Sequence, residues 1–533
     1  MSSIMATTLI DLIQQTIRSN WASMALSDYH GKNYTYGDIA LIIDHYHSLF
    51  RQLAIQQGDR IAICGNGSAQ WGISFFATIT YGAVAVPILT GFTPTQIQDI
   101  VKHSDARLLF ASAQINSTLD SSELSQLVKI LLIEDIQKVS PLQQAPAIDW
   151  PSESSPNDVM MLNYTSGTTG FSKGVMLPYR AFLGNYDFFK ASLGHQMKAG
   201  APHLSVLPMA HMYGLTLELI CPFISGCHIT ILGRTPSPSI LLEAFAEVKP
   251  VVFMAVPLVI EKLTKIIVTP LMKNPRVEKA LRWPVLRTFA RMWLNRKLIH
   301  AFGGNLYQVI SGGSAINRSV ENTLRTVNFP LTEAYGATEC APMITFCDYT
   351  KKRHGSCGTG VAGMEIRIDS SDPINQPGEI LTRGQNTMLG YYKNPEATQE
   401  ALYAEGWYHT GDIGVVDADG YVYIKGRKKN MLLGSNGQNI YPEEIEDKLN
   451  SMLMVAESIV VQRGNQLVAL VHPDYAEANE LGLTDENIER IMELNTTDIN
   501  EIIPAYEHIH HIEIVREEFE KTAKKSLKRY LYK

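Results

Sequence analysis

The sequence lacks the marks of several protein classes. Its six cysteines form no C-x-x-C pair, so neither a zinc ribbon nor a disulfide framework is predicted, and the cysteines are expected to be reduced. Lys and Arg number 46 against 53 Asp and Glu, whereas a nucleic-acid binder normally carries an excess of positive charge. The N-terminus has no basic segment followed by an apolar stretch and a small-residue cleavage site. These absences favour a cytoplasmic protein with no nucleic-acid partner.

One long uncharged stretch has to be weighed as a membrane span. Residues 65–95 contain no charged residue, and about 20 apolar residues suffice to cross a bilayer. Several polar residues and Pro87 interrupt the stretch. Its pattern instead predicts a capped buried helix, a turn at Tyr81 and Gly82, and a buried strand over residues 84–89. A transmembrane helix is therefore not expected.

Length and periodicity predict two domains of α/β character. A chain of 533 residues exceeds what one hydrophobic core usually supports. Short apolar runs that alternate with helix-length segments predict buried strands of an α/β fold; these runs are residues 60–64, 84–88, 107–111, 203–207, 228–232 and 251–256. Near residue 426 the pattern changes to a small α+β unit, with helices over 443–450 and 484–502 and strands over 458–462 and 467–472. We expect an N-terminal domain of layered sheets and helices over residues 1–428 and a C-terminal domain over 429–533.

A loop rich in hydroxyls and glycines indicates phosphate binding. Residues 164–174 read YTSGTTGFSKG, in which glycines allow backbone N–H groups to approach a phosphate and Lys173 adds positive charge. The segment is not a P-loop, because Gly174 rather than Ser or Thr follows the lysine. Taken alone it could equally be a flexible surface turn.

Three further motifs follow this loop in a fixed order. They are LTEAYGATE at residues 331–339, YHTGD at 408–412 and GRKK at 426–429. Together the four segments resemble the signatures of the adenylate-forming superfamily, which comprises acyl-CoA synthetases, luciferases and the adenylation domains of peptide synthetases. The resemblance covers essentially the whole chain and is greatest to bacterial long-chain fatty acyl-CoA synthetases.

The resemblance assigns a nucleotide and metal site. Glu339 and Thr165 would hold Mg²⁺, for which a carboxylate is a suitable hard ligand, although a lone Glu is usually a solvated charge. Tyr335 would stack on adenine, and Asp412 and Arg427 would bind the ribose; singly, these three are equally explained as a core aromatic, a turn residue and a surface charge. The other residues expected to bind ATP are Ser166, Gly167, Thr168, Thr169, Gly170, Lys173, Gly313, Gly336 and Thr338.

The catalytic lysine and the hinge come from the same resemblance. The hinge falls at Lys429, and residues 434–439 resemble the mobile loop that follows it. Lys525 is the candidate catalytic lysine, with Lys524 as the alternative, because the glycine that many relatives have before this lysine is absent. Glu339 and Lys173 complete the expected catalytic set. Ser172 stands where a proline is common, which removes a φ restraint but no phosphate donor.

The segment LPMAHMYG at residues 207–214 corresponds to the family region beside the acyl pocket. His211 and Gly312 would line that pocket, although His211 could equally be a core histidine with a satisfied hydrogen bond. Met209, Met212 and Tyr213 offer adaptable apolar surface suited to a hydrocarbon chain, or they could be core residues.

The implied reaction uses ATP, Mg²⁺ and coenzyme A to convert a medium- to long-chain fatty acid into its acyl-AMP and then its CoA thioester. Two alternatives stay open: an acyl-AMP ligase that loads a separate acyl carrier protein, and a catalytically silent nucleotide- or fatty-acid-binding protein. The basic tail over residues 521–533 could attract anionic lipid, so peripheral contact with the inner face of the membrane is considered. The sequence leaves monomer and homodimer open.

Overall fold

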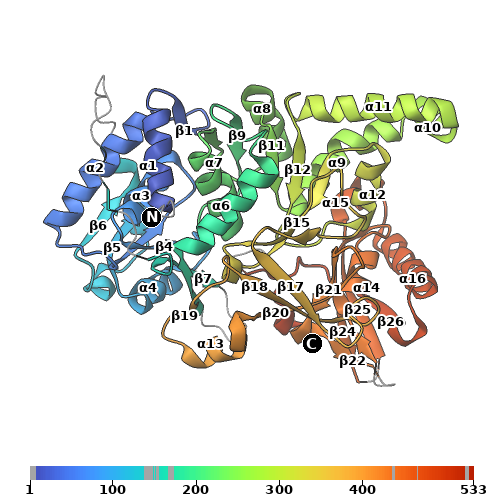
Figure 1. Cartoon of the computed structure of the whole chain (residues 1–533). Helices are drawn as coiled ribbons and strands as arrows, with labels where there is room; N and C mark the ends of the chain where they lie inside the picture. The colour runs from blue at the N-terminus through green and yellow to red at the C-terminus, as the bar shows by residue number, and fades with distance from the viewer. Residues whose placement is uncertain are drawn as a thin grey trace.

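The structure is a computed structural model that describes residues 8–136, 148, 150–151, 155–165, 173–434, 438–464, 466–522 and 527–532. Figure 1 shows two unequal parts, a large N-terminal domain and a smaller C-terminal domain that lies against one side of it. The predicted fold class, a large α/β domain followed by a small α+β domain, is confirmed. The predicted boundary between residues 428 and 429 stays a prediction.

A seven-stranded sheet forms the first half of the N-terminal domain, in the order β19-β8-β7-β4-β3-β5-β6. The parallel strands are β3 (Arg60–Cys64), β4 (Val84–Ile88), β5 (Ala106–Ala111), β6 (Lys129–Leu132) and β7 (Val159–Thr165). Strands β8 (Lys173–Pro178) and β19 (Gly390–Tyr391) add antiparallel edges. Helices α1 (Leu9–Ser19), α2 (Tyr36–Gln52), α3 (Ala69–Thr80), α4 (Pro94–His103) and α6 (Tyr179–Leu193) belong to this half.

The second half contains a four-stranded sheet, β2-β1-β10-β9, and a three-stranded parallel sheet, β11-β12-β13. Their strands are β1 (Met24–Asp28), β2 (Asn33–Thr35), β9 (Pro202–Ser205), β10 (His228–Ile231), β11 (Val252–Ala255), β12 (Gln308–Ser311) and β13 (Leu331–Glu333). The helices here are α8 (Pro238–Val248), α9 (Pro257–Met272), α10 (Pro275–Arg282), α11 (Pro284–Ala301) and α12 (Arg318–Thr326). A π-helix, η3 (Gly214–Ile220), runs into α7 (Cys221–Ile224) beneath β9.

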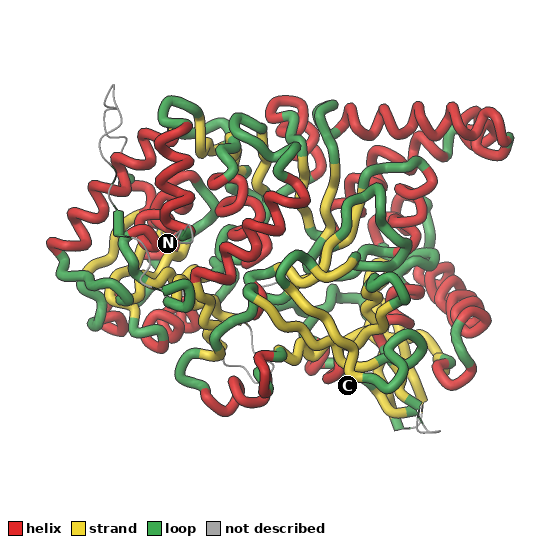
Figure 2. Tube along the Cα trace, viewed as in Figure 1, coloured by secondary structure: helices red, strands yellow, loops and turns green. Residues whose placement is uncertain are grey.

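An antiparallel region connects this domain to the next. It contains the sheet β17-β18-β20-β21 and the small sheet β14-β15-β16, which Figure 2 shows as a group of strands at the centre of the molecule. The strands are β14 (Tyr335–Gly336), β15 (Met343–Phe346), β16 (Thr359–Gly360), β17 (Met364–Asp369), β18 (Gly378–Gly384), β20 (Tyr408–Val416) and β21 (Val422–Arg427), with helix α13 (Pro395–Ala401) beside β19.

The C-terminal domain has its own apolar core. Strands β24 (Val455–Arg463), β25 (Gln466–Pro473) and β26 (Ile509–Ile514) form one sheet, and β22 (Leu432–Leu433) pairs with β23 (Asn439–Ile440). Helices α14 (Pro442–Leu449), α15 (Tyr475–Glu480) and α16 (Asp485–Ile502) complete the domain. Ile445, Val460 and Ile499 are among the buried residues that join helices to sheet.

Polar contacts fix the C-terminal domain against the N-terminal one. Arg318 Nε lies 3.0 Å from Asp447 Oδ2, and Lys265 Nζ lies 3.0 Å from Asp474 Oδ2 and 3.1 Å from Glu477 Oε2. These ion pairs join α12 and α9 to α14 and α15, and they define the relative position of the domains in this conformation.

The predicted elements exist, with small shifts at their ends. Strands β3 and β4 have the predicted bounds, whereas β9 ends at Ser205 rather than at residue 207. The uncharged stretch forms α3, which is capped by Ser68 accepting a hydrogen bond from Trp71 N, then a turn with Gly82 at φ +83°, then β4. Within the described residues, no helix has both the length and the apolar character that crossing a membrane requires.

Candidate nucleotide and acyl site

The β7–β8 hairpin brings the two ends of the predicted phosphate loop together. Thr165 and Lys173 are register partners across the hairpin. Ser166, Gly167, Thr168, Thr169 and Gly170 lie outside the described residues. Strand β19 pairs with β8 on the other side, and the Lys173 ammonium lies 4.9 Å from the centre of the Tyr391 ring. Lys173 is therefore held at the hairpin mouth, beside an aromatic face.

Tyr391 joins this lysine to the candidate metal ligand. Its hydroxyl donates a hydrogen bond of 3.0 Å to Glu339 Oε1, and the backbone N–H of Met388 donates to the Glu339 carbonyl at 2.8 Å. Burial raises the pKa of Tyr391 well above its ordinary value, and the charge of Glu339 adds to that shift, so the phenol stays protonated and can donate. Sequence analysis missed Tyr391, because only the β19–β8 pairing places it beside Glu339.

A second cluster joins Tyr335, Asp412 and Arg427. The Tyr335 hydroxyl donates to Asp412 Oδ2 at 2.6 Å, and Arg427 Nε lies 2.7 Å from Asp412 Oδ1. Strands β20 and β21 place Asp412 and Arg427 opposite each other in register. Burial raises the pKa of the Asp412 carboxyl, and the Arg427 charge and the Tyr335 hydrogen bond act in the opposite direction.

Three predicted glycines lie where a side chain would not fit or would be strained. A Cβ on Gly336 would lie 2.2 Å from the Pro342 carbonyl oxygen. At Gly312 it would lie 3.2 Å from the Tyr213 ring. Gly313 has φ +95°, in the region that disfavours other residues. Thr338 begins the short 3₁₀ helix that also contains Glu339.

The predicted acyl segment lies directly beside the nucleotide cluster. The backbone N–H of Ala334, which precedes Tyr335, donates to Ser311 O at 2.8 Å, so Gly312 is next to the strand that begins with Tyr335. Tyr213 packs against Gly312 and donates its hydroxyl hydrogen bond to Ile310 O at 3.0 Å. His211 is half-buried, and its Nδ1 accepts a hydrogen bond from Tyr213 N at 3.3 Å.

Glu218, within the π-helix, organises the start of this segment. It is fully buried, and its Oε2 accepts hydrogen bonds from Leu207 N at 2.8 Å, Val206 N at 3.1 Å and Ser205 Oγ at 3.1 Å. Burial raises the pKa of Glu218 to about 8, and the hydrogen bonds from Leu207 and its neighbours limit the rise. The sequence offered one signal, an acidic residue inside an apolar helical run, which was not used.

The segment before the predicted hinge is tied to the N-terminal domain. Lys428 Nζ lies 2.8 Å from Glu379 Oε2, and the other Glu379 oxygen accepts from Gly411 N at 3.1 Å. Lys429 follows immediately in a short 3₁₀ turn. Glu379 is a further residue that sequence reasoning missed, since nothing in its local sequence marks it.

Lys525 and Lys524 lie outside the described residues, but the chain on both sides of them is defined. Lys521 and Leu527 face each other in an isolated antiparallel bridge. Lys528 N donates to Glu520 O at 2.8 Å, and Arg529 pairs with the buried Glu446 of α14. Both flanks are thus attached to the C-terminal domain.

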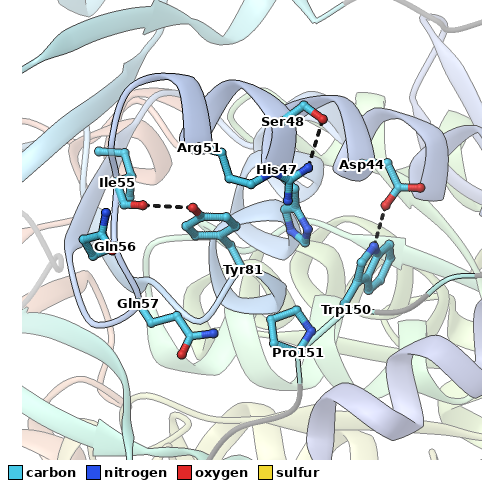
Figure 3. A pocket seen from close by; sticks show the side chains of 10 residues that line it. All are labelled: Asp44, His47, Ser48, Arg51, Ile55, Gln56, Gln57, Tyr81, Trp150 and Pro151. Carbon is cyan, nitrogen blue, oxygen red and sulfur yellow. Dashed lines mark hydrogen bonds between the residues drawn. The ribbon is translucent and has the colours of Figure 1, made fainter.

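A separate cavity of about 550 Å³ is remote from these clusters in the fold, between α2 and the turn after α3. Figure 3 shows its lining, with Trp150 Nε1 donating to Asp44 at 2.6 Å and the Tyr81 hydroxyl donating to Ile55 O at 2.8 Å. None of the predicted site residues lines it.

Family comparison agrees with this arrangement. Residues 14–392 match the AMP-binding enzyme family, and residues 429–532 match the AMP-binding enzyme C-terminal domain. The chain belongs to the AMP-binding enzyme family, that is, to the adenylate-forming enzymes. This confirms the resemblance inferred from the motifs.

Among curated relatives, the chain is 29% identical over 444 residues to the long-chain-fatty-acid–CoA ligase FadD15 of Mycobacterium bovis, which covers 77% of this chain and 72% of the relative. It is 26% identical over 523 residues to 4-coumarate–CoA ligase 2 of Oryza sativa, with 91% and 84% covered. Family and relatives support acid–CoA ligation through an acyl-AMP intermediate, but the two relatives differ in their acid.

Solved structures share the fold. ATP-bound MatB of Rhodopseudomonas palustris aligns with a TM-score of 0.79 at 20% identity, covering 99% of this chain and 98% of that one. O-succinylbenzoate coenzyme A synthetase (MenE) of Bacillus subtilis, in complex with ATP and magnesium ion, aligns with a TM-score of 0.77 at 21% identity, covering 97% and 98%. At these identities the likeness concerns the fold alone.

Proposed function

We propose that the chain is an AMP-forming acid–CoA ligase that activates a medium- to long-chain fatty acid. The observation that carries the proposal is the convergence of six predicted residues into two adjacent clusters, one around Glu339 and one around Asp412. ATP, Mg²⁺ and coenzyme A are the co-substrates and the metal of such a reaction.

The residues around Glu339 fit a magnesium ion. Glu339 Oε1 accepts the Tyr391 hydrogen bond, and the carboxylate has a second oxygen that can bind a metal ion. Thr165 supplies a hydroxyl from the hairpin. A carboxylate and a hydroxyl are the hard oxygen ligands that Mg²⁺ takes when phosphates provide the rest. When bound, the ion would neutralise charge on the ATP phosphates.

The Asp412 cluster fits the nucleoside. A carboxylate can accept hydrogen bonds from both ribose hydroxyls, and Arg427 can donate to the same sugar. Tyr335 offers an aromatic ring whose orientation is fixed by its hydroxyl bond to Asp412. Gly313, where a Cβ would meet nothing closer than Val256 at 3.8 Å, provides backbone without a side chain, where a ligand can approach closely. These residues would hold the α-phosphorus near the acyl segment.

In the first step a substrate carboxylate oxygen attacks the α-phosphorus, the bond to the bridging oxygen breaks, and pyrophosphate leaves with that electron pair. This chemistry needs positioning and charge neutralisation more than proton transfer. Lys173 and the loop donors would stabilise the departing pyrophosphate, and Lys525 would bridge the carboxylate and the α-phosphate.

In the second step the coenzyme A thiolate attacks the acyl carbonyl carbon, and AMP leaves. We assign the hinge to Lys429, about which the C-terminal domain would turn so that Lys525 withdraws and residues 434–439 approach the thiol. The anchoring of Arg427 and Lys428 to Asp412 and Glu379 supports a pivot at this position.

The preference for a fatty acid rests on the acyl segment. Met209, Met212 and Tyr213 are buried, Tyr213 packs against Gly312, and flexible thioether side chains adapt to an alkyl chain. An aromatic acid is the specific rival, since a 4-coumarate–CoA ligase is among the relatives. His211 is the polar residue of this segment that could approach the substrate carboxylate.

The test is AMP release from ATP with acetate, octanoate, palmitate, 4-coumarate and amino acids, each with and without coenzyme A. The proposal expects release that depends on both coenzyme A and a fatty acid. Release that peaks with 4-coumarate would replace the fatty acid by an aromatic acid. Acid-dependent pyrophosphate exchange without coenzyme A turnover would indicate a carrier-protein acceptor. The absence of AMP release with every acid would rule out ligase activity.

A further inference from the structure

Helices α10 and α11 form a hairpin that extends beyond the body of the N-terminal domain (Figures 1 and 2). Only Trp283 separates the two helices. On its inner side the hairpin is anchored, because Leu294 and Leu298 of α11 are buried in the apolar cluster that includes α8 and α9. The hairpin is therefore a fixed projection of the domain.

The outer side of this hairpin is unusually apolar. Six large hydrophobic side chains are exposed within eleven residues: Trp283 (60%), Val285 (73%), Leu286 (50%), Phe289 (66%), Met292 (49%) and Trp293 (44%). Across the part of the chain that the structure describes, every exposed tryptophan and phenylalanine belongs to this run. A contiguous apolar group of this kind marks an interaction surface rather than ordinary surface scatter.

The spacing places the five of these residues that belong to α11 on one helix face. Val285, Phe289 and Met292 recur at intervals of four and three, and Leu286 and Trp293 are seven apart. Leu294 and Leu298, which face the core, lie on the opposite side of α11. The exposed residues thus form a stripe, which we call the α11 stripe.

Positive charge predominates on the hairpin, although the whole chain carries a formal −7. Between residues 273 and 300 the only acidic residue is Glu278, which pairs with Arg282 at 2.5 Å. Lys297 lies 5.9 Å from the centre of the Trp293 ring, at one end of the stripe. The basic residues of the hairpin are Lys273, Arg276, Lys279, Arg282, Arg287, Arg291, Arg296 and Lys297.

We propose that the α10–α11 hairpin is a membrane-docking element that lays the α11 stripe into the surface of an anionic bilayer. An amphipathic helix with a basic rim lies in the interface with its apolar face about 5–10 Å deep. Tryptophan suits that depth, because its ring is apolar and its N–H can reach water or headgroups. The basic residues would pair with lipid phosphates.

Other occupants match the hairpin less well. A second copy joined by a two-fold axis would bring the same stripe, and the same cluster of cations, face to face. A nucleic acid would satisfy the cations but would leave Val285, Leu286 and Met292 without an apolar partner. A bilayer surface satisfies the apolar stripe and the basic rim together.

The basic tail, the other candidate for lipid contact, has much of its charge engaged within the chain. Lys521 pairs with Glu457, Lys528 with Glu520 and Arg529 with Glu446. Arg296 and Lys297 have no such ion pair among the described residues. The hairpin is thus the stronger attachment point.

Docking of this kind is independent of the acid that the enzyme activates, although it would bring a site for fatty acids to the layer in which such acids partition. The experiment therefore omits ATP, acid and coenzyme A. The full chain is mixed with vesicles of phosphatidylcholine alone, or of phosphatidylcholine with phosphatidylglycerol, and the bound fraction is measured by flotation.

We expect binding to the mixed vesicles that weakens as salt is raised. The double variant Phe289→Glu, Trp293→Glu should lower the partition coefficient by about tenfold or more, because it puts charge into the apolar stripe. Arg296→Gln with Lys297→Gln should lower it about tenfold or more on the anionic vesicles only. The matched control is Leu481→Glu with Leu494→Glu, which alters two residues of similar exposure on the C-terminal domain and should change nothing.

A readout on the unaltered chain covers the case in which a variant fails to fold. Brominated lipid should quench the fluorescence of Trp283 and Trp293, which are the exposed tryptophans. Trp71 and Trp150 are buried, and Trp21 and Trp407 are half-buried and lie outside the hairpin. No binding to anionic vesicles, binding without quenching, or binding unchanged in the stripe variant would overturn the proposal. A stripe variant that alters the oligomeric state but not vesicle binding would assign the surface to a second copy instead.

Discussion

Tyr335 and Asp412, which are 77 residues apart in the sequence, are joined by a hydrogen bond of 2.6 Å from the phenol to the carboxylate. The residue proposed to stack on adenine and the residue proposed to bind ribose are therefore oriented as one unit. Arg427 holds the other carboxylate oxygen, so the unit is fixed from two sides before any nucleotide is present.

This relationship predicts different effects for two small substitutions. Tyr335→Phe keeps the ring but removes the donor, and we expect a rise of a few-fold in the KM for ATP. Asp412→Asn removes the charge that Arg427 faces, and hydrogen bonds to charged groups contribute about 1.5–3 kcal/mol, so ATP use should fall about tenfold to a hundredfold. Pyrophosphate exchange at varied ATP measures both. Equal kinetics for Asp412→Asn and the wild type would contradict the ribose assignment.

Glu339 is proposed to bind Mg²⁺ and Tyr391 to hold Glu339 in position, so substitutions at these two residues should have different effects. Glu339→Gln removes the charge proposed to hold Mg²⁺, so the magnesium concentration for half-maximal activity should rise about tenfold or more. Tyr391→Phe removes one neutral donor and leaves that charge in place, so its effect should be much smaller. The measurement is the activity of both variants as a function of magnesium concentration. An unchanged titration curve for Glu339→Gln would remove the residue from the metal site.

The roles of Lys525 and Lys524 are tested by measuring the two half-reactions separately. Lys525→Ala should abolish acid-dependent pyrophosphate exchange and leave coenzyme A-dependent consumption of supplied acyl-AMP largely intact. Lys524→Ala is the matched neighbour and should leave both half-reactions active. The reverse result would transfer the role to Lys524, and loss of both half-reactions in Lys525→Ala would show a defect that is not specific to adenylation.

Glu218 predicts a pH dependence of stability. Burial raises its pKa from 4.5 to about 8 in the folded chain, so between these values the folded state holds a proton that the unfolded state has lost. The free energy of unfolding contributed by this group therefore falls as pH rises from about 5 to 8. Glu218→Gln keeps an acceptor oxygen and removes the titration.

Thermal unfolding of the wild type and Glu218→Gln across that pH window measures the effect. The difference between the two melting temperatures should shift in favour of the variant as pH rises. A constant difference would show that Glu218 does not change its protonation there. Glu218→Ala, which leaves the donors of Leu207 and Val206 unpaired, should lower stability by about 3 kcal/mol near pH 5 and by less as pH rises toward 8.

The parts of the fold that could be predicted are those with strong local signals. Strands β3 and β4 are short apolar runs bounded by turn residues, and their predicted bounds agree with the structure. The predicted end of strand β9 is two residues too late, because residues 206 and 207 are apolar yet turn away to donate their N–H groups to Glu218. The contact with Glu218 is a tertiary one, and the local sequence pattern of the strand does not predict it.

The residues of the site likewise fall into two groups, those that a local motif marks and those that no local motif marks. Glu339, Asp412 and Arg427 lie in recognisable motifs, so they could be selected from the sequence. Tyr391 and Glu379 could not, because each acts through a partner that is distant along the chain. Tyr391 reaches Glu339 through the β19–β8 pairing, and Glu379 on β18 reaches Lys428 at the end of β21, two strands away in the same sheet. The roles proposed for Ser166–Gly170 and Lys525 stay predictions.

The two ion pairs just before Lys429 limit the number of conformations that the enzyme can adopt. Arg427 and Lys428 are each fastened to a carboxylate of the N-terminal domain, so torsional freedom begins only after them. Each residue contributes two soft dihedrals, and a turn confined to one or two residues has few combinations that avoid steric clash. Single-molecule fluorescence between the two domains should then resolve a small set of discrete distances, with abrupt transitions between them, rather than one broad distribution.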